Sequence, residues 1–282
     1  WIPLQVTEDK GLFSKAGVPV TLQWFDGYLD SINALNAGQL DCNSQTLGDT
    51  ISSIAGGAEL QVVLTNDYST GNDQIIAAPG IKTVADLKGK KVAVAPGSAV
   101  WFAWAMTMVE NNVPYNTFQA VNRQGGGTAF VQAMKRGDID AMVLWEPFES
   151  QAVAEGDAYF ATKLDYSQSR SVGAELGMLA ASREAMTTKK DLVQRFLWAY
   201  LKVEEQMAKN SDMFADAYSK YTGLPLNVTK ESAKIIKLGG VLTKEQVSRL
   251  AEAAFKQGIV QKDVTKEAAD LYDDSMAKEI KK

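Results

Sequence analysis

Leu35-Asn36-Ala37-Gly38-Gln39-Leu40-Asp41 and Arg136-Gly137-Asp138-Ile139-Asp140 are two copies of one helix-to-strand corner. In each copy a glycine ends an amphipathic helical run, and an apolar residue opens a strand. Glycine suits this position because it adopts a left-handed backbone conformation at no steric cost. The repeated corner predicts two α/β units built on one plan.

Around these corners, short β-like runs alternate with amphipathic helical runs over the first two-thirds of the chain. The predicted strands cover residues 18–24, 40–44, 60–66, 74–78, 91–95, 118–122 and 139–144. The predicted helices cover residues 28–36, 47–55, 100–110, 128–136 and 147–155. Strands that alternate with helices are typical of parallel, doubly wound α/β sheets.

The pattern changes after about residue 182, where only helical runs follow. They cover residues 191–209, 213–221, 230–238, 244–257 and 266–280. Thr243 and Gln246 match a capping box at the start of one of these helices. The last third of the chain is therefore predicted to form a helical layer.

The composition is that of a soluble globular protein. Of the 282 residues, 46% are hydrophobic and 22% are charged. A formal net charge of −5 without a basic stripe argues against a nucleic-acid partner. No apolar run approaches the roughly 18–20 residues that a membrane-spanning helix needs. The sequence opens at Trp1 without a methionine, which we interpret as a processed or trimmed start.

The chain contains no histidine. This removes the commonest general base and the commonest metal ligand together. Ser-His-Asp and Cys-His nucleophile pairs and His-ligated zinc sites are therefore impossible. We expect no catalytic residues, no cofactor and no metal, and we interpret the chain as a binding protein rather than an enzyme.

Two further stretches, and the segment that follows the second corner, extend the pattern over nearly the whole chain. They are residues 8–18 (EDKGLFSKAGV), residues 84–98 (VADLKGKKVAVAPGS) and the corner at 137–141 that leads into Trp145-Glu146-Pro147. Together with the corner at 35–41, in this order and spacing, they resemble the periplasmic substrate-binding proteins of ABC importers. The branch they resemble binds sulfonates, taurine, nitrate or thiamine-pyrimidine precursors.

The resemblance implies a type II periplasmic-binding-protein fold, in which two α/β lobes are joined by two crossing strands. The crossings are expected near residues 74–78 and 178–182. Lobe one would comprise 1–77 and 179–282, lobe two 78–178, with the ligand cleft between them. Family members usually begin with a strand before the first helix, and this strand is largely missing here.

The same resemblance implies how such a protein works. A small-molecule ligand is captured by hinge closure and delivered to an ABC transporter permease in the membrane. The location would be periplasmic, or lipid-anchored outside the cytoplasmic membrane, and we expect a monomer.

Ligands of open α/β sheets bind at the carboxyl ends of strands, near helix N-termini. The loops predicted to lie there are rich in aromatic and acidic side chains and hold one basic residue, Arg123. The candidate ligand-binding residues are Trp1, Phe25, Asp26, Tyr28, Thr46, Asp67, Ser98, Trp101, Trp145, Glu146 and Glu175.

Several candidates have a purely structural alternative. Asp26, Thr46 and Ser98 precede predicted helices and could serve as N-caps. Asp67 and Asp73 flank a glycine turn, and a turn role is the simpler interpretation for both. In the same way, the helix that contains Trp101 is largely apolar, which would suit a core residue.

Acids beside aromatic faces favour a cation or a planar ligand rich in N–H donors, through charge pairing and cation–π contact. We therefore expect a small cationic or amino-rich planar ligand, guanidinium- or aminopyrimidine-like. The alternative is a small oxyanion (alkanesulfonate, taurine or nitrate) held by Arg123 and the helix N-termini at Thr46 and Ser98. A second alternative is a pyrimidine-precursor synthase-like enzyme on the same fold, although such enzymes use a histidine of their own.

Overall fold

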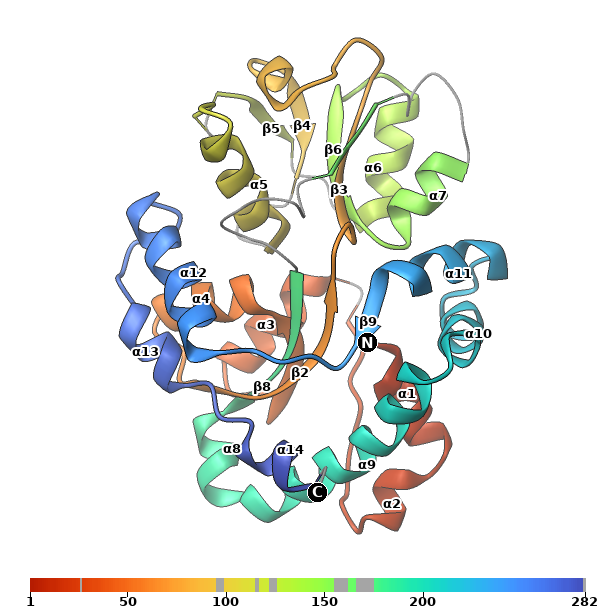
Figure 1. The fold of residues 1–282 in the computed structure, drawn as a ribbon, viewed down its shortest axis with the longest axis vertical. Helices are drawn as coiled ribbons and strands as arrows, with labels where there is room; N and C mark the ends of the chain where they lie inside the picture. Colours follow the sequence, from red (N-terminus) through yellow and green to blue (C-terminus); the bar gives the residue numbers. More distant parts are fainter. Residues whose placement is uncertain are drawn as a thin grey trace.

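The structure is a computed structural model, which describes residues 1–25, 27–94, 99–114, 117–121, 126–154, 162–165 and 175–280. Its strands form two separate sheets, and each sheet has its own helices. Figure 1 shows the five-stranded sheet at the top of the molecule and the four-stranded sheet below it. Within the described residues, no helix combines the length and the apolar character needed to cross a lipid bilayer.

The four-stranded sheet has the order β1-β8-β2-β9. Its strands are β1 (Cys42–Thr46), β8 (Glu175–Ser182), β2 (Leu60–Ser69) and β9 (Ile236–Leu238). All neighbouring strands in it run antiparallel. The central strand β8 is buried through a continuous apolar run from Met178 to Ala181. Such a run is typical of a strand covered on both faces.

The five-stranded sheet has the order β5-β4-β6-β3-β7. Its strands are β5 (Gln119–Val121), β4 (Lys91–Ala93), β6 (Ala141–Trp145), β3 (Asp73–Ala77) and β7 (Thr162–Asp165). β4 runs parallel to β5 and β6, whereas β3 is antiparallel to β6 and β7. The predicted α/β class with two sheets is confirmed, but the parallel direction holds only around β4.

The chain changes sheets between Ser69 of β2 and Asp73 of β3, and again between β7 and Glu175 of β8. Both changes come earlier than the crossings predicted at 74–78 and 178–182. The reason is strand pairing. β3 is paired within the five-stranded sheet over its whole length, and β8 is paired within the four-stranded sheet from its first residue. The assignment of residues to two lobes stays a prediction.

Helices cover both sheets. The five-stranded sheet carries the short helix η1 (Val84–Leu87), α5 (Ala99–Glu110), α6 (Gly126–Lys135) and α7 (Phe148–Ala154). Around the four-stranded sheet lie α1 (Ile2–Asp9), α2 (Leu12–Lys15), α3 (Tyr28–Asn36) and α4 (Leu47–Ala55).

The predicted C-terminal helical layer surrounds the four-stranded sheet as well (Figure 1). Its helices are α8 (Arg183–Thr188), α9 (Lys190–Ala208), α10 (Ser211–Thr222), α11 (Leu226–Ile235), α12 (Lys244–Lys256), α13 (Thr265–Asp270) and α14 (Ser275–Ile280). The expected capping box opens α12, because Gln246 N donates to Thr243 Oγ1 at 3.1 Å and Thr243 N donates to Gln246 Oε1 at 2.9 Å.

The strand predicted at 18–24 does not form. Val18 is buried, Val20 and Leu22 are half-buried, and all three pack in a cluster with Phe196 of α9. The alternating apolar residues of this segment are therefore buried against the surface of a helix and not within a sheet. Hydrophobic periodicity does not distinguish these two partners.

Two predicted helices, at 230–238 and 266–280, are interrupted for one physical reason. The edge of β2 offers unpaired backbone groups, and nearby segments pair with it. Residues 236–238 leave α11 to form β9 on this edge. Farther along, Val62 N donates to Leu271 O and Asp273 N donates to Val62 O, both at 2.9 Å, which separates α13 from α14.

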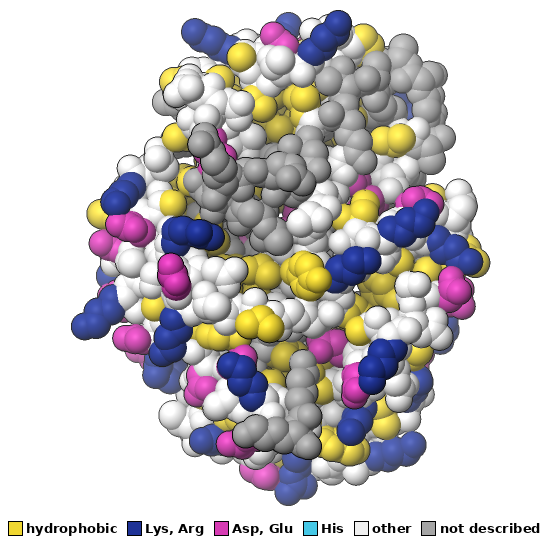
Figure 2. Space-filling view, viewed as in Figure 1, with side chains coloured by type: hydrophobic (Ala, Val, Ile, Leu, Met, Phe, Trp, Pro, Cys, Tyr) yellow, Lys and Arg dark blue, Asp and Glu magenta, His cyan; other side chains and the backbone are white. Residues whose placement is uncertain are grey.

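Charged side chains of both signs are interspersed over the lower part of the molecule on the face shown in Figure 2. No continuous basic patch forms among the described side chains of this face. The described charges on this face are therefore mixed in sign.

Candidate ligand-binding site

A cavity of about 990 Å³ is lined by residues of both sheets and of the surrounding helices. Four carboxylates face it, from Asp67, Asp73, Glu146 and Glu175, and no described residue of its lining is a lysine or an arginine. Its aromatic lining residues are Trp1, Trp24, Tyr28, Trp145, Phe148, Phe214, Tyr218 and Tyr221. The volume and the mixture of apolar walls with a few polar groups are typical of small-molecule sites.

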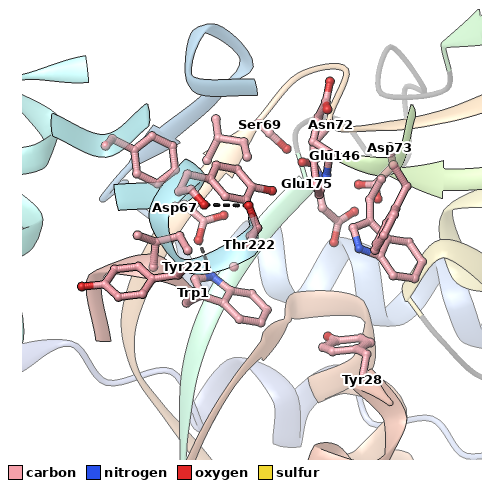
Figure 3. Close-up of a pocket in the computed structure, with 18 of the residues that line it drawn as sticks. Trp1, Tyr28, Asp67, Ser69, Asn72, Asp73, Glu146, Glu175, Tyr221 and Thr222 are labelled. Atoms are coloured by element: carbon pink, nitrogen blue, oxygen red, sulfur yellow. Dashed lines mark hydrogen bonds between the residues drawn. The ribbon is translucent and has the colours of Figure 1, made fainter. Parts of the chain in front are cut away.

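The four carboxylates come from places where strands end or begin. Asp67 lies near the end of β2, Asp73 and Glu175 open β3 and β8, and Glu146 follows β6 directly. Figure 3 shows Asp73, Glu146 and Glu175 gathered on one side of the cavity, with Asp67 and Trp1 on the other. The two changes of sheet therefore bring acidic side chains together from both halves of the chain.

Asp67 is held by its neighbours. The Trp1 indole Nε1 donates a hydrogen bond to its Oδ2 (Figure 3). On the adjacent strand β8 stands Gly177, where an added Cβ would lie 2.6 Å from Asp67 Oδ2. Burial raises the pKa of Asp67 to about 6, although the indole hydrogen bond acts in the opposite direction.

A second buried carboxylate, Asp49, lies behind the wall of the cavity. The Tyr28 hydroxyl donates to Asp49 Oδ2 at 2.6 Å, and the Thr46 hydroxyl donates to the same oxygen at 2.9 Å. Thr46 also caps α4, because its Oγ1 accepts from Asp49 N at 3.3 Å. Burial raises the pKa of Asp49 to about 6. The N-terminus of α4 therefore already carries an acid of its own.

Glu146 is buried, and both of its carboxylate oxygens accept a hydrogen bond. Ser150 of α7 donates to Oε1 at 2.6 Å, and Ser232 of α11 donates to Oε2 at 3.0 Å. Ser232 belongs to the helical layer around the four-stranded sheet, whereas Glu146 directly follows β6 of the five-stranded sheet. This carboxylate therefore connects the two halves of the molecule.

Glu175 differs from the other three. Among the described residues, none donates a hydrogen bond to its carboxylate. Its pKa is raised well above the usual range, first by burial and then by the negative charges of Asp73, Asp49 and Asp67. Asp73 itself is 7% exposed. The cavity thus concentrates acidic groups where water does little to screen them.

The structure places the sequence candidates in three groups. Those that line the cavity are Trp1, Tyr28, Thr46, Asp67, Trp145, Glu146 and Glu175. Phe25 and Trp101 do not line it. Asp26 and Ser98, and the alternative residue Arg123, lie outside the described residues.

The two candidates that miss the cavity have physical reasons for doing so. Trp101 packs against the core of the five-stranded sheet, with its ring centroid 6.0 Å from that of Phe118. Trp24, and not Phe25, reaches the lining. Successive side chains of an extended segment point to opposite sides, so an error of one residue exchanges the inner and outer positions.

The sequence interpretation also missed lining residues. Asp73 was assigned to a turn because it follows Gly71-Asn72, yet it opens β3 and faces the cavity. Its acidic side chain at the start of a strand was the available signal. Tyr218 and Tyr221 come from α10, and nothing in the local pattern of that helix indicates a ligand site.

No group of three or more histidine, cysteine, aspartate or glutamate side chains with metal-binding geometry occurs among the described residues.

The two sheets, the double crossing and the cavity between them define the periplasmic-binding-protein fold. The match to the family model described as NMT1/THI5 like covers residues 1–213, so the chain belongs to the NMT1/THI5-like family.

Similar proteins include binding proteins of related type. A Bacillus subtilis (strain 168) protein, provisionally named an aliphatic sulfonates-binding protein, is 26% identical over 82% of this chain and 70% of its own length. The solved structure of the alkanesulfonate-binding protein SsuA from Xanthomonas axonopodis pv. citri, bound to MOPS, has a TM-score of 0.80. It is 19% identical and covers 96% of this chain and 94% of its own.

An enzyme shares the fold. The solved structure of the desulfurization enzyme DSZB has a TM-score of 0.67 and 13% identity, and covers 99% of this chain and 95% of its own. The fold therefore does not by itself distinguish a binding protein from an enzyme, and the residues of the site have to decide between them.

Proposed function

We propose that the chain is the substrate-binding component of an ABC importer and captures a small cationic or amino-rich planar molecule, guanidinium- or aminopyrimidine-like. Closure of lobe one (1–77 and 179–282) on lobe two (78–178) encloses the ligand. The closed form delivers it to a membrane permease from the periplasm or from a lipid anchor on the outer side of the cytoplasmic membrane. The protein acts as a monomer and does not turn the ligand over.

The observation that carries the proposal is the charge of the cavity. Its described lining holds four carboxylates and neither lysine nor arginine. Burying several carboxylates in one cavity is costly, and a cationic ligand would lower that cost. Of the four, Asp67 already lies beside the α-amino group of Trp1. The aromatic residues beside these acids supply faces on which a planar cation can stack.

The hydrogen-bond donors that line the cavity also support a positively charged ligand. Several lining groups that could hydrogen-bond an anion already donate to the protein: Trp1 to Asp67, Tyr28 to Asp49, Tyr221 to Asp9 and Thr222 to the Tyr218 carbonyl. Ser69, Asn72 and Tyr218 also line the cavity and can donate. The four carboxylates are acceptors, and acceptors select a ligand that supplies N–H groups.

The second candidate function is the binding of a small oxyanion such as an alkanesulfonate, taurine or nitrate. The sulfonate-binding relatives favour it. In this chain it would depend on Arg123 and on the helix N-termini at Thr46 and Ser98. The oxygen-rich surroundings of Thr46 weigh against it, because Asp49 occupies the N-terminus of α4.

Catalysis is a third possibility on this fold, as the desulfurization enzyme shows for its own chain. The sequence lacks histidine, the commonest general base, and no group with metal-binding geometry is found among the described residues. Mass spectrometry of the ligand after prolonged incubation with the protein should therefore show it unchanged.

Calorimetry against a panel of ligands tests the charge assignment. Guanidinium at millimolar concentration and an aminopyrimidine represent the leading proposal, and taurine and nitrate represent the alternative. We expect heat of binding from the first group only. Taurine or nitrate binding at micromolar strength, without binding of either nitrogen compound, would refute the cationic assignment and favour the oxyanion.

A further inference from the structure

We infer that Asp73 and Glu175 together recognise the charge of the ligand, and that they select a planar cation with several N–H donors, a guanidinium or amidinium group. This inference rests on the proposed function, because it names the residues and the ligand class of that same cavity. It corrects the expectation that Asp73 serves only the turn before β3.

The position of the two residues singles them out. The chain changes sheets between Ser69 and Asp73, and again between Asp165 and Glu175, so that Asp73 and Glu175 are the first residues of the strands that follow. Glu175 is paired with Ser69, the last residue of β2, and Asp73 is paired with Trp145. The two carboxylates thus stand at the two points where one half of the molecule meets the other, and both line the cavity.

The other acids of the region already have donors. Asp67 accepts from the Trp1 indole, Asp49 from Tyr28 and Thr46, and Glu146 from Ser150 and Ser232. Glu175 accepts no hydrogen bond from any residue that the structure describes, although it lies in the same acidic surroundings. It is therefore the carboxylate best placed to accept from a ligand.

Electrostatics explain why a permanent positive charge is favoured. Glu175 faces Asp73, Asp49 and Asp67, and all of them oppose its ionisation, which holds its pKa well above the usual range. Glu146 adds a fourth acid to the lining. A guanidinium group keeps its charge at every physiological pH, so it relieves this repulsion, whereas a neutral aminopyrimidine does not.

The surroundings also favour a planar ion with donors over a quaternary ammonium. Trp145 is paired with Asp73 and lines the cavity next to it, with its ring centroid 6.0 Å from that of Phe148. A guanidinium can stack on an indole face while its N–H groups reach carboxylates in its own plane. A quaternary ammonium can stack but leaves the carboxylates without donors.

The experiment is calorimetry of the whole chain with guanidinium, 4-aminopyrimidine and tetramethylammonium. The variants are Glu175→Gln and Asp73→Asn, with Glu184→Gln, at an exposed position of helix α8, as the matched control. Loss of a charge-assisted hydrogen bond should weaken guanidinium binding by about ten- to a hundredfold in each cavity variant. The control should bind as the unaltered protein does.

A second measurement uses the unaltered protein, so it does not depend on whether the variants fold. Titration with guanidinium near pH 6 to 7, in two buffers of different ionisation enthalpy, should show release of protons, because a bound cation lowers the raised pKa values of Glu175 and its acidic neighbours. Uptake of protons, or no exchange at all, would contradict the role of Glu175.

The outcomes separate this inference from the proposed function. Guanidinium binding that both cavity variants leave unchanged overturns the inference alone. So does tighter binding of tetramethylammonium or 4-aminopyrimidine than of guanidinium. Binding of taurine or nitrate with no response to any cation overturns the proposed charge of the ligand itself.

Discussion

At the scale of single residues, burial makes the acids of the cavity sensitive to pH. The pKa values of Asp49 and Asp67 rise to about 6, from an ordinary value of about 3.9. The native state therefore binds protons more tightly than the unfolded chain does. The resulting stabilisation is complete below about pH 4 and is lost as the pH rises through about 6. Glu175 shifts in the same direction.

We therefore predict that the unliganded protein melts at a higher temperature at pH 5 than at pH 7.5. The carboxyl groups with lowered pKa values, such as Asp9, titrate below this window. Burial also lowers the pKa of the Trp1 α-amino group, which acts against the trend, so the two buried aspartates have to outweigh it. Thermal unfolding followed by circular dichroism across this range is the measurement. The double variant Asp49→Asn, Asp67→Asn should flatten the profile, and an equally steep profile in that variant would refute this origin.

Gly177 provides a second test at this scale. An alanine there would place its Cβ 2.6 Å from Asp67 Oδ2, so the carboxylate or the strand has to move. We predict that Gly177→Ala lowers the free energy of unfolding by about 1–3 kcal/mol. Urea unfolding is the measurement. In the double variant with Asp67→Ala most of the loss should disappear, and a full loss in that variant would show that the clash is not with this side chain.

At the scale of elements, Glu146 joins the strand end of β6 to helix α11 through Ser232. A hydrogen bond to a charged group typically contributes about 1.5–3 kcal/mol when buried. We predict that Ser232→Ala weakens closure and raises the dissociation rate of the bound ligand several-fold, while association changes little. Stopped-flow fluorescence of the cavity tryptophans measures both rates.

The control for this prediction is Ser150→Ala. Ser150 donates to the same carboxylate but lies on α7, on the same side of the cavity as Glu146. Its loss should affect the two rates less than the loss of Ser232. Equal effects of the two variants would mean that the hydroxyls merely hold Glu146 and that the link to α11 has no special part in closure.

At the scale of the whole molecule, two changes of sheet form the only covalent connections between the halves of the described chain. A ligand that binds acids from both halves should draw them together. We predict that saturating guanidinium reduces the radius of gyration in small-angle X-ray scattering and leaves the molecular mass that of a monomer. Glu175→Gln at the same concentration should scatter as the unliganded protein. If calorimetry shows that the protein is saturated with guanidinium but its radius of gyration does not fall, hinge closure is contradicted.

The sequence alone determined the features that depend on local order. The corners at Gly38 and Gly137 predicted the α/β alternation, and the box at Thr243 and Gln246 predicted the start of α12, because both signals act over a few neighbouring residues. The absence of histidine excluded catalytic sites and metal sites that depend on this residue, and no structure was needed for that. The class of fold followed from these local signals and from the family resemblance. So did three of the four acidic lining residues, but only three of the eight aromatic ones.

Other features depended on contacts between segments far apart in the chain. Residues 18–24 pack on α9 instead of pairing as a strand, and residues 236–238 leave a helix to pair with the edge of β2. The partnership of Asp73 with Glu175 arises because two crossings bring them together across about a hundred residues of sequence. Local sequence patterns indicate whether a segment tends to form a helix or a strand. The pKa of a carboxylate depends instead on the distant groups that surround it, and only folding brings those groups together.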